Sequence, residues 1–193
     1  MGKQFPAMLP EHEAFIKQQR IFFVGSAMAE GHVNISPKGH DVFRIFSPTE
    51  VAYLDLTGSG NETSAHLTKQ DRITLMFMAF EGAPMILRLY GKGRVILPST
   101  PEWDRLIPHF EPLPGARQII YADIHTVKTS CGFSVPFFSY EGERETLLKW
   151  AAQKGEQGLD AYHREKNTVS MDGVVTPLGQ QLASSSRSGE GTD

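Results

Sequence analysis

The segment TGSGNETSAHL, residues 57–67, carries the residue types and spacing best suited to chemistry. It follows an apolar run, passes through Gly58 and Gly60, and enters a short helical pattern. The hydroxyl side chains around this helix start are Thr57, Ser59, Thr63 and Ser64. Free backbone amides and hydroxyls at a helix start suit a phosphate dianion. Ser59 and Glu62 also have capping-box spacing, so a plain capped helix is the alternative and the commoner case. The P-loop order GxxxxGK is absent.

Outside this segment, few residues suggest chemistry. Cys131 is the only cysteine, which excludes an intramolecular disulfide and a cysteine-clustered zinc site. Burial as a small apolar side chain is the expected role of Cys131. The seven histidines lack HExxH and HxH spacing, so we expect no metal site. His66 is a weak phosphate-donor candidate, because an exposed helical histidine is the commoner case. We identify no catalytic residue.

Short β-prone runs separated by Gly, Pro, Asp and Ser must position that segment. The runs cover residues 21–29, 32–36, 42–47, 50–56, 73–80, 85–97 and 117–129. Residues 81–84 join two of them as a hairpin. Gly91 and Gly93 interrupt the run 85–97, which is typical of a bulge or a sharp bend. The pattern predicts antiparallel strands that curve into a barrel.

Helical periodicity predicts peripheral helices over residues 9–19 and 100–110, and C-terminal helices over about 141–167 that break at Gly155. Trp103 and Trp150 fall on apolar helix faces, where core or interface anchors are expected. We predict one domain over residues 1–182 and a disordered tail over residues 183–193, which lacks apolar periodicity.

Four of these segments, in order, resemble the pyridoxamine 5'-phosphate oxidase-like, FMN-binding split-barrel family. They are NISPKG (34–39), EVAYLDL with its loop (50–67), KQDRITLMFMAF (69–80) and LRLYGKGRVI (87–96). The resemblance implies a mainly β fold with peripheral helices, specifically a six-stranded antiparallel split β-barrel. It also implies a homodimer that holds FMN at the subunit interface.

The resemblance further implies a set of cofactor-binding residues. Those along the flavin ring are Ile35, Ser36, Pro37 and Lys38. Those beside the ribityl chain are Leu54, Asp55 and Thr57. Those around the phosphate are Asn61, Glu62, Thr63 and Ser64.

The chain departs from the true pyridoxamine phosphate oxidases in the phosphate segment. Those enzymes have an Arg-Lys pair where this chain has Glu62 and Thr63, so charge-assisted phosphate contacts are partly lost. Candidates to replace them are Lys38, Arg44 and Arg88. The end of the chain also lacks the matching Arg-x-His pattern. We therefore predict an FMN-dependent oxidoreductase of another specificity. A deazaflavin-dependent reductase, a non-enzymatic flavin- or haem-binding module and a cofactor-free dimeric interaction domain remain alternatives.

The composition argues against nucleic acids and membranes as binding partners. The formal net charge is −3 and basic residues are scattered, which argues against nucleic-acid binding. No apolar stretch approaches the roughly 20 residues that span a bilayer, and the first residues lack the layout of a secretory signal. We therefore expect a soluble cytoplasmic protein whose ligands are a small-molecule substrate or a nicotinamide donor.

Overall fold

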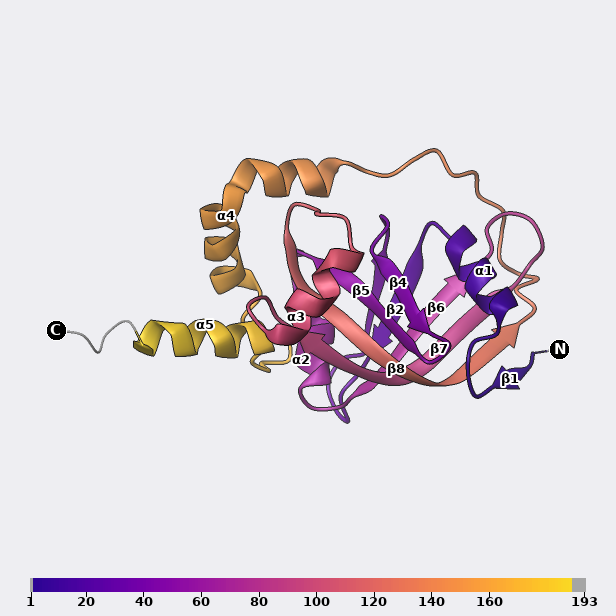
Figure 1. Ribbon diagram of the computed structural model, residues 1–193, viewed down its shortest axis with the longest axis horizontal. Coiled ribbons are helices and arrows are strands. Elements are labelled where there is room, and N and C mark those ends of the chain that lie inside the picture. The colour runs from indigo at the N-terminus through magenta and orange to yellow at the C-terminus, as the bar shows by residue number, and fades with distance from the viewer. Residues whose placement is uncertain (1, 189–193) are drawn as a thin grey trace.

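The computed structural model describes residues 2–188, with side chains through residue 185. One antiparallel sheet forms the body, and helices lie around it (Figure 1). The strands are β1 (Gln4–Phe5), β2 (Phe22–Ser26), β3 (Asn34–Lys38), β4 (Phe43–Ser47), β5 (Glu50–Leu56), β6 (Arg72–Met78), β7 (Ile86–Ile96) and β8 (Ala116–Ser130). Their order is β3-β2-β6-β7-β8-β5-β4, and β1 pairs with β8. The sheet is therefore open, with β3 and β4 at its two ends.

All seven β-prone runs of the sequence form strands, β2 to β8, and every pairing is antiparallel. The predicted mainly β fold with peripheral helices is confirmed. The strand count differs, because the sheet has eight strands where six are expected. Part of the difference is β1, whose two residues are too few to show an alternating pattern.

Apolar side chains on one face of the strands fill the core. In β6, Ile73, Leu75 and Phe77 are buried and alternate with more accessible residues, as a half-buried strand requires. The Phe22 ring lies 5.1 Å from that of Phe43 and 5.4 Å from that of Phe77. Burial stabilises by roughly 1.5–3 kcal/mol per large apolar side chain, so this cluster anchors the sheet.

The long strand β8 brings distant parts of the chain together. It lies between β7 and β5, and Gln118 is the register partner of Asp55. The predicted irregularity in β7 is confirmed as a register shift between Tyr90 and Gly91. A Cβ atom on Gly91 would lie 2.5 Å from the carbonyl oxygen of Asp123, so only glycine fits there.

The helices are α1 (Pro10–Gln18), α2 (Glu62–Leu67), α3 (Pro101–Leu106), α4 (Thr146–Lys166) and α5 (Pro177–Ser188), with a 3-10 turn over Ile107–His109. As predicted, α4 breaks at Gly155, whose φ of 63° is non-helical, and Figure 1 shows the resulting bend. The predicted disordered tail is wrong for residues 183–188, which continue α5. The last residues, 189–193, lie outside the described part of the chain.

Candidate functional site

A cavity of about 440 Å³ lies beside β3, the ends of β5 and β8, and the loop before α2. We call it the polar cavity. Its lining residues are Asn34, Ser36, Pro37, Lys38, Asp55, Leu56, Gly58, Ser59, Gly60, Asn61, Glu62, Thr63 and Arg117. The volume falls within the range of small-molecule sites.

Two cations meet one buried carboxylate in this wall. Lys38 Nζ lies 2.7 Å from Asp55 Oδ1, and Arg117 Nε donates to Asp55 Oδ2 over 2.9 Å. Burial alone would raise the pKa of Asp55. The charges of Arg117 and Lys38 outweigh that effect and hold the pKa well below its usual range. Asp55 is therefore ionised at neutral pH, and it fixes both cations at the edge of the cavity.

The loop 58–60, which we call the glycine loop, is held in place by Asn167, which is fully buried. Asn167 Nδ2 donates to the Gly58 carbonyl over 3.0 Å, and its Oδ1 accepts from Arg117 Nη1 over 2.9 Å. Arg117 Nη1 also donates to the Gly60 carbonyl over 2.9 Å. The loop conformation is thus set by β8 and by the chain that follows α4.

A chain of buried amides continues the network toward α2. Gln118 Nε2 donates to Asp55 Oδ2 and to Asn61 Oδ1, each over 2.8 Å. Ser64 Oγ donates to Gln118 Oε1 over 3.1 Å. Buried polar groups of this kind are stabilising only when their partners are in place, and here they are. The wall is therefore preorganised.

The start of α2 differs from the capping-box prediction. Asn61, not Ser59, occupies the N-cap position, and its side chain makes no capping hydrogen bond because it bonds to Gln118 and to the Asn167 carbonyl. Glu62 instead accepts from the backbone N–H of Met171 over 3.2 Å. The loop is thus tied to the C-terminal segment rather than closed on itself.

The polar cavity gathers many of the residues that the family resemblance implies. Those in its wall are Ser36, Pro37, Lys38, Asp55, Asn61, Glu62 and Thr63. The others named from the sequence lie outside the wall: Ile35 is 67% exposed on β3, Leu54 and Ser64 are buried beside the cavity, and Thr57 bonds to Gly115 and His163.

Two of the three suggested replacement cations point elsewhere. Arg88 donates to Ser130 Oγ over 3.1 Å on β7, outside the polar cavity. Arg44 pairs with Asp41 over 2.8 Å. Lys38 is the suggested cation that lines the cavity.

Two expectations about burial are wrong. His66 is buried, not exposed, because α2 packs against β2. The His66 Nδ1 atom lies 3.0 Å from Ser26 Oγ. Cys131 is exposed, not buried, because β8 ends at residue 130 and the chain leaves the sheet there.

Sequence reasoning missed Arg117 and Asn167. A signal for Arg117 exists, since it stands at the start of residues 117–122 of β8, which are all buried, and a charge in such a run needs a partner. No local pattern marks Asn167, which lies at the end of α4 and reaches Gly58 across 109 positions of sequence.

The helix α4 braces the same loop through His163. His163 Nε2 lies 2.8 Å from Thr57 Oγ1, which itself donates to the Gly115 carbonyl. Burial lowers the pKa of His163, and the nearby charge of Arg117 lowers it further. The imidazole is therefore neutral at pH 7 and serves as a hydrogen-bonding brace.

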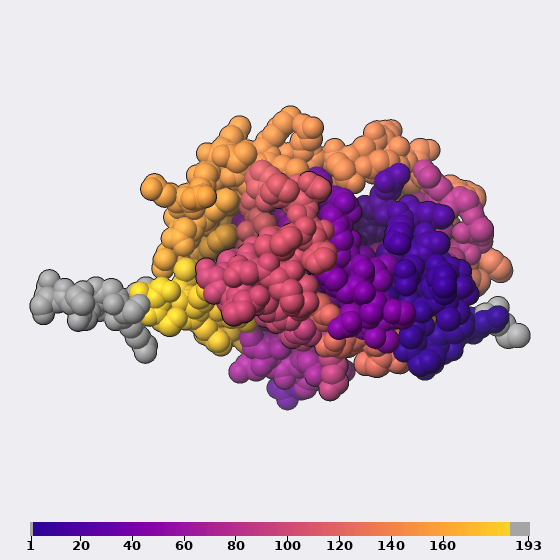
Figure 2. Space-filling view, viewed as in Figure 1, coloured from indigo at the N-terminus to yellow at the C-terminus, as the bar shows by residue number. Residues whose placement is uncertain are grey.

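A second, larger cavity of about 1170 Å³ adjoins the far end of β3, and we call it the aromatic cavity. Its rings are Phe80, Phe138, Tyr140 and Trp150. Residues 131–145, which connect β8 to α4 without helix or strand, supply one wall, and Figure 2 shows this connection as a band across the top of the molecule. Pro37 lines both cavities. Trp150, expected as a core or interface anchor, is instead half-buried in this wall.

Residues 8–131 match the pyridoxamine 5'-phosphate oxidase family model. The chain belongs to the pyridoxamine 5'-phosphate oxidase family. A curated relative from Aspergillus flavus, the pyridoxamine 5'-phosphate oxidase family protein ustO, is 37% identical in an alignment of length 177, and the match covers 81% of this chain and 70% of the relative.

Solved structures support the split-barrel fold of this family member. A point variant of HupZ from Group A Streptococcus superposes with a TM-score of 0.52 at 15% identity, covering 63% of this chain and 98% of HupZ. A structure assigned as a pyridoxamine 5'-phosphate oxidase of Lactobacillus delbrueckii gives a TM-score of 0.50 at 14% identity, covering 64% and 94% of the two chains.

Members of the pyridoxamine 5'-phosphate oxidase family commonly bind a flavin, and the polar cavity fits the phosphate end of one by its donors. Lys38 and Arg117 supply charged N–H groups. Thr63 Oγ1 accepts from Asn34 Nδ2 over 3.0 Å, which leaves its own hydrogen for another acceptor. Asp55 and Glu62 offset the two cations, so the wall offers hydrogen bonds without net positive charge.

Residues 2–188 show neither a membrane-spanning helix nor a metal centre. Within that range, none of the helices combines the length and apolar character that a bilayer crossing demands. The same residues contain no cluster of three or more His, Cys, Asp or Glu side chains arranged to hold a metal ion.

Proposed function

We propose that this family member is an FMN-dependent oxidoreductase whose polar cavity holds the phosphate end of the flavin. The observation that carries the proposal is the placement of Lys38 and Arg117 beside the loop 58–60, in a wall already fixed by hydrogen bonds. Preorganised donors bind an oxyanion without further ordering cost, which favours a phosphate ester over water.

The proposed holding residues act in distinct ways. Lys38 faces the phosphate with a charged donor, and the hydroxyls of Ser36 and Thr63 add neutral ones. Arg117 contributes mainly positive charge, because its Nε and Nη1 groups already donate to Asp55, Gly60 and Asn167. Asp55 keeps the two cations in place without contacting an anion itself. Leu54, Thr57 and Ser64 support the wall from behind, while Ile35 is exposed on β3 and free to meet the ring or a second subunit.

A bound flavin supplies hydride exchange at its ring, so the protein needs no acid or base of its own for that step. The task of this chain is to orient the flavin, to exclude water and to admit a substrate. The ionised Asp55 is structural, because Lys38, Arg117 and Gln118 bond to its two oxygens. The neutral His163 is structural as well, because its Nε2 is bonded to Thr57.

The proposal includes a homodimer. The edge strand β3 leaves Ile35 67% exposed, and Val33 just before it is 70% exposed. Phe133 and Phe137, in the connection 131–145, are each 81% exposed. Exposed edge strands and large apolar side chains favour association, and a second copy of the chain is the partner expected in this family.

A vitamin-phosphate substrate is disfavoured. Such a substrate needs cations beyond those that hold the flavin phosphate, whereas Glu62 adds a negative charge at the same cavity. We therefore propose an oxidoreductase whose substrate lacks a phosphate group.

The visible absorbance spectrum of the purified protein, before and after FMN is added, tests the proposal. We expect bands of an oxidised flavin that bleach when NADPH or NADH is added. A Soret band would show that the protein binds haem instead of a flavin. A colourless protein that takes up no FMN would reject the proposed function in favour of an interaction domain.

A further inference from the structure

The aromatic cavity has the size and surface of a binding site for an organic molecule. Its volume of about 1170 Å³ exceeds that of most drug-sized ligand sites, which leaves room for a ligand and water. The Phe80 and Phe138 rings meet edge to face at 5.2 Å, and Phe138 is still 60% exposed. Aromatic faces left uncovered inside a cavity favour a planar apolar ligand.

The acidic groups in this wall are already engaged by the protein. Glu143 accepts from the His40 backbone N–H over 3.1 Å and from the Tyr140 hydroxyl over 2.9 Å. Glu81 accepts from the Tyr140 backbone N–H over 3.3 Å. These bonds tie the connection 131–145 to the body and leave both carboxylates partnered.

The cations of the wall differ from each other. The Arg20 guanidinium lies over the Tyr140 ring, 5.1 Å from its centroid. Arg144 also lines the cavity, yet within residues 2–188 it forms no hydrogen bond, ion pair or ring contact. Arg144 is therefore a charged donor left available to a ligand.

We propose that the aromatic cavity binds the substrate and that this substrate is a planar aromatic carboxylate recognised by Arg144. A single guanidinium matches the two oxygens of a carboxylate. A phosphate dianion would bring a second negative charge close to Glu81 and Glu143, whereas Arg20 is held over the Tyr140 ring. The inference rests on the proposed flavin function, because the ligand is a substrate only if FMN binds in the neighbouring polar cavity. Pro37 lines both cavities.

Calorimetric titration of the full chain with saturating FMN tests the proposal, using 2-naphthoate and its uncharged isostere 2-naphthamide as probes. We expect the acid to bind roughly tenfold tighter than the amide. Arg144→Gln should abolish that preference and leave FMN affinity unchanged. Trp150→Ala should weaken both probes equally.

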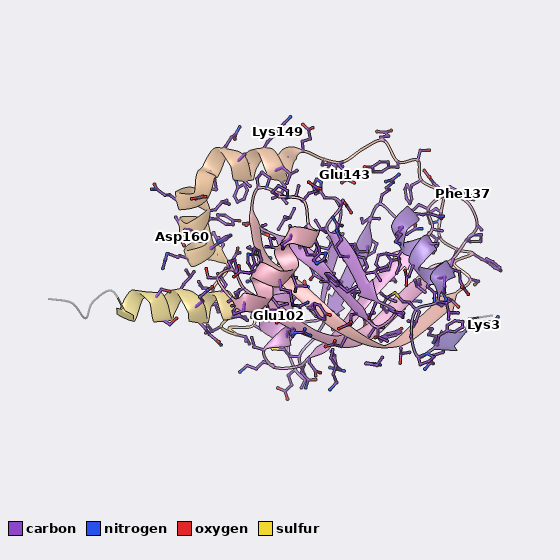
Figure 3. The ribbon with its side chains drawn as sticks, in the orientation of Figure 1. Lys3, Glu102, Phe137, Glu143, Lys149 and Asp160 are labelled. Atoms are coloured by element: carbon purple, nitrogen blue, oxygen red, sulfur yellow. The ribbon has the colours of Figure 1, made fainter. Side chains whose placement is uncertain are left out.

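Arg164→Gln is the matched control. Arg164 lies on α4 and pairs over 2.9 Å with Asp160, which points away from the body in Figure 3. This variant should keep the preference for the acid. Loss of the preference in Arg164→Gln as well would trace it to general charge and overturn the inference.

The outcomes separate the two proposals. A chain that binds FMN but binds acid and amide equally, or neither, overturns the substrate inference and leaves the flavin function standing. A chain that fails to bind FMN yet shows the Arg144-dependent preference rejects the flavin function and supports the carboxylate site. Probe binding that vanishes as dimers form in analytical ultracentrifugation shows that a second copy fills the cavity, which also overturns the inference.

Discussion

The two cavities that meet at Pro37 are built in opposite ways. The polar cavity has walls of strand, helix start and glycine loop, and buried side chains hold one another by hydrogen bonds. The aromatic cavity takes a wall from residues 131–145, which form no regular element and leave Phe133 and Phe137 exposed. A rigid, satisfied shell suits a constant ligand, whereas a loosely held wall suits a ligand that varies among relatives.

The two cavities should also differ in how much a substitution in their walls changes the free energy of unfolding. Removing one partner from a buried ion pair leaves a buried charge without a counter-charge, which lowers stability strongly. Substitution of an exposed charged group lowers stability little. Substitutions in the polar wall should therefore affect folding and flavin binding together. Substitutions in the connection 131–145 should leave stability nearly unchanged.

The largest effect is expected from Asp55→Asn. It leaves Arg117 buried without its carboxylate, so the free energy of unfolding should fall by about 3–5 kcal/mol in urea denaturation. Asp41→Asn, which breaks the exposed pair with Arg44, is the control and should cost at most about 1 kcal/mol. Equal losses in the two variants would contradict the buried network.

Asn167→Ala should cause the next largest loss of stability. It removes bonds to the Gly58 carbonyl and to Arg117, and leaves buried groups unsatisfied at a cost of about 1–3 kcal/mol in unfolding free energy. FMN affinity should also drop, because the glycine loop loses its support. Normal stability with normal FMN affinity would show that the loop holds its shape without the C-terminal segment.

The pH dependence of stability should report on His163. Burial lowers its pKa in the folded state, so below the unfolded value of about 6.5 the unfolded chain binds more protons and stability falls. Unfolding free energies from pH 7.5 to pH 5 should therefore fall less steeply in His163→Gln than in the wild type. His12, whose pKa is also lowered by burial, is common to both proteins and cancels in the difference. Parallel curves would refute this role.

The smallest effect is expected at the aromatic cavity. Tyr140→Phe removes the hydroxyl bond to Glu143 at a site that is 46% exposed, so the unfolding free energy should change by no more than about 0.5 kcal/mol. Thermal denaturation provides the comparison with the wild type. A loss of several kcal/mol would mean that the connection 131–145 is as firmly built as the polar wall.

The sequence predicts the strands better than the site. Short β-prone runs bounded by Gly, Pro, Asp and Ser mark β2 to β8, because both strand-forming residues and turn residues are local signals. The polar cavity depends on pairings between remote segments, such as Arg117 with Asn167 across 50 positions. The family resemblance named Lys38, Asp55 and Thr63, which line the polar cavity, because the motifs that contain them are local. No local rule reveals that the chain after α4 returns to hold the glycine loop.

In the function proposed above, the polar cavity binds a flavin through its phosphate. Titration of the protein with FMN and with riboflavin, followed by flavin fluorescence, tests it most directly because the two ligands differ only in that phosphate. We expect FMN affinity roughly tenfold or more above that of riboflavin, with the gap reduced in Lys38→Met. Equal affinities for the two ligands, or an undiminished gap in Lys38→Met, would contradict it.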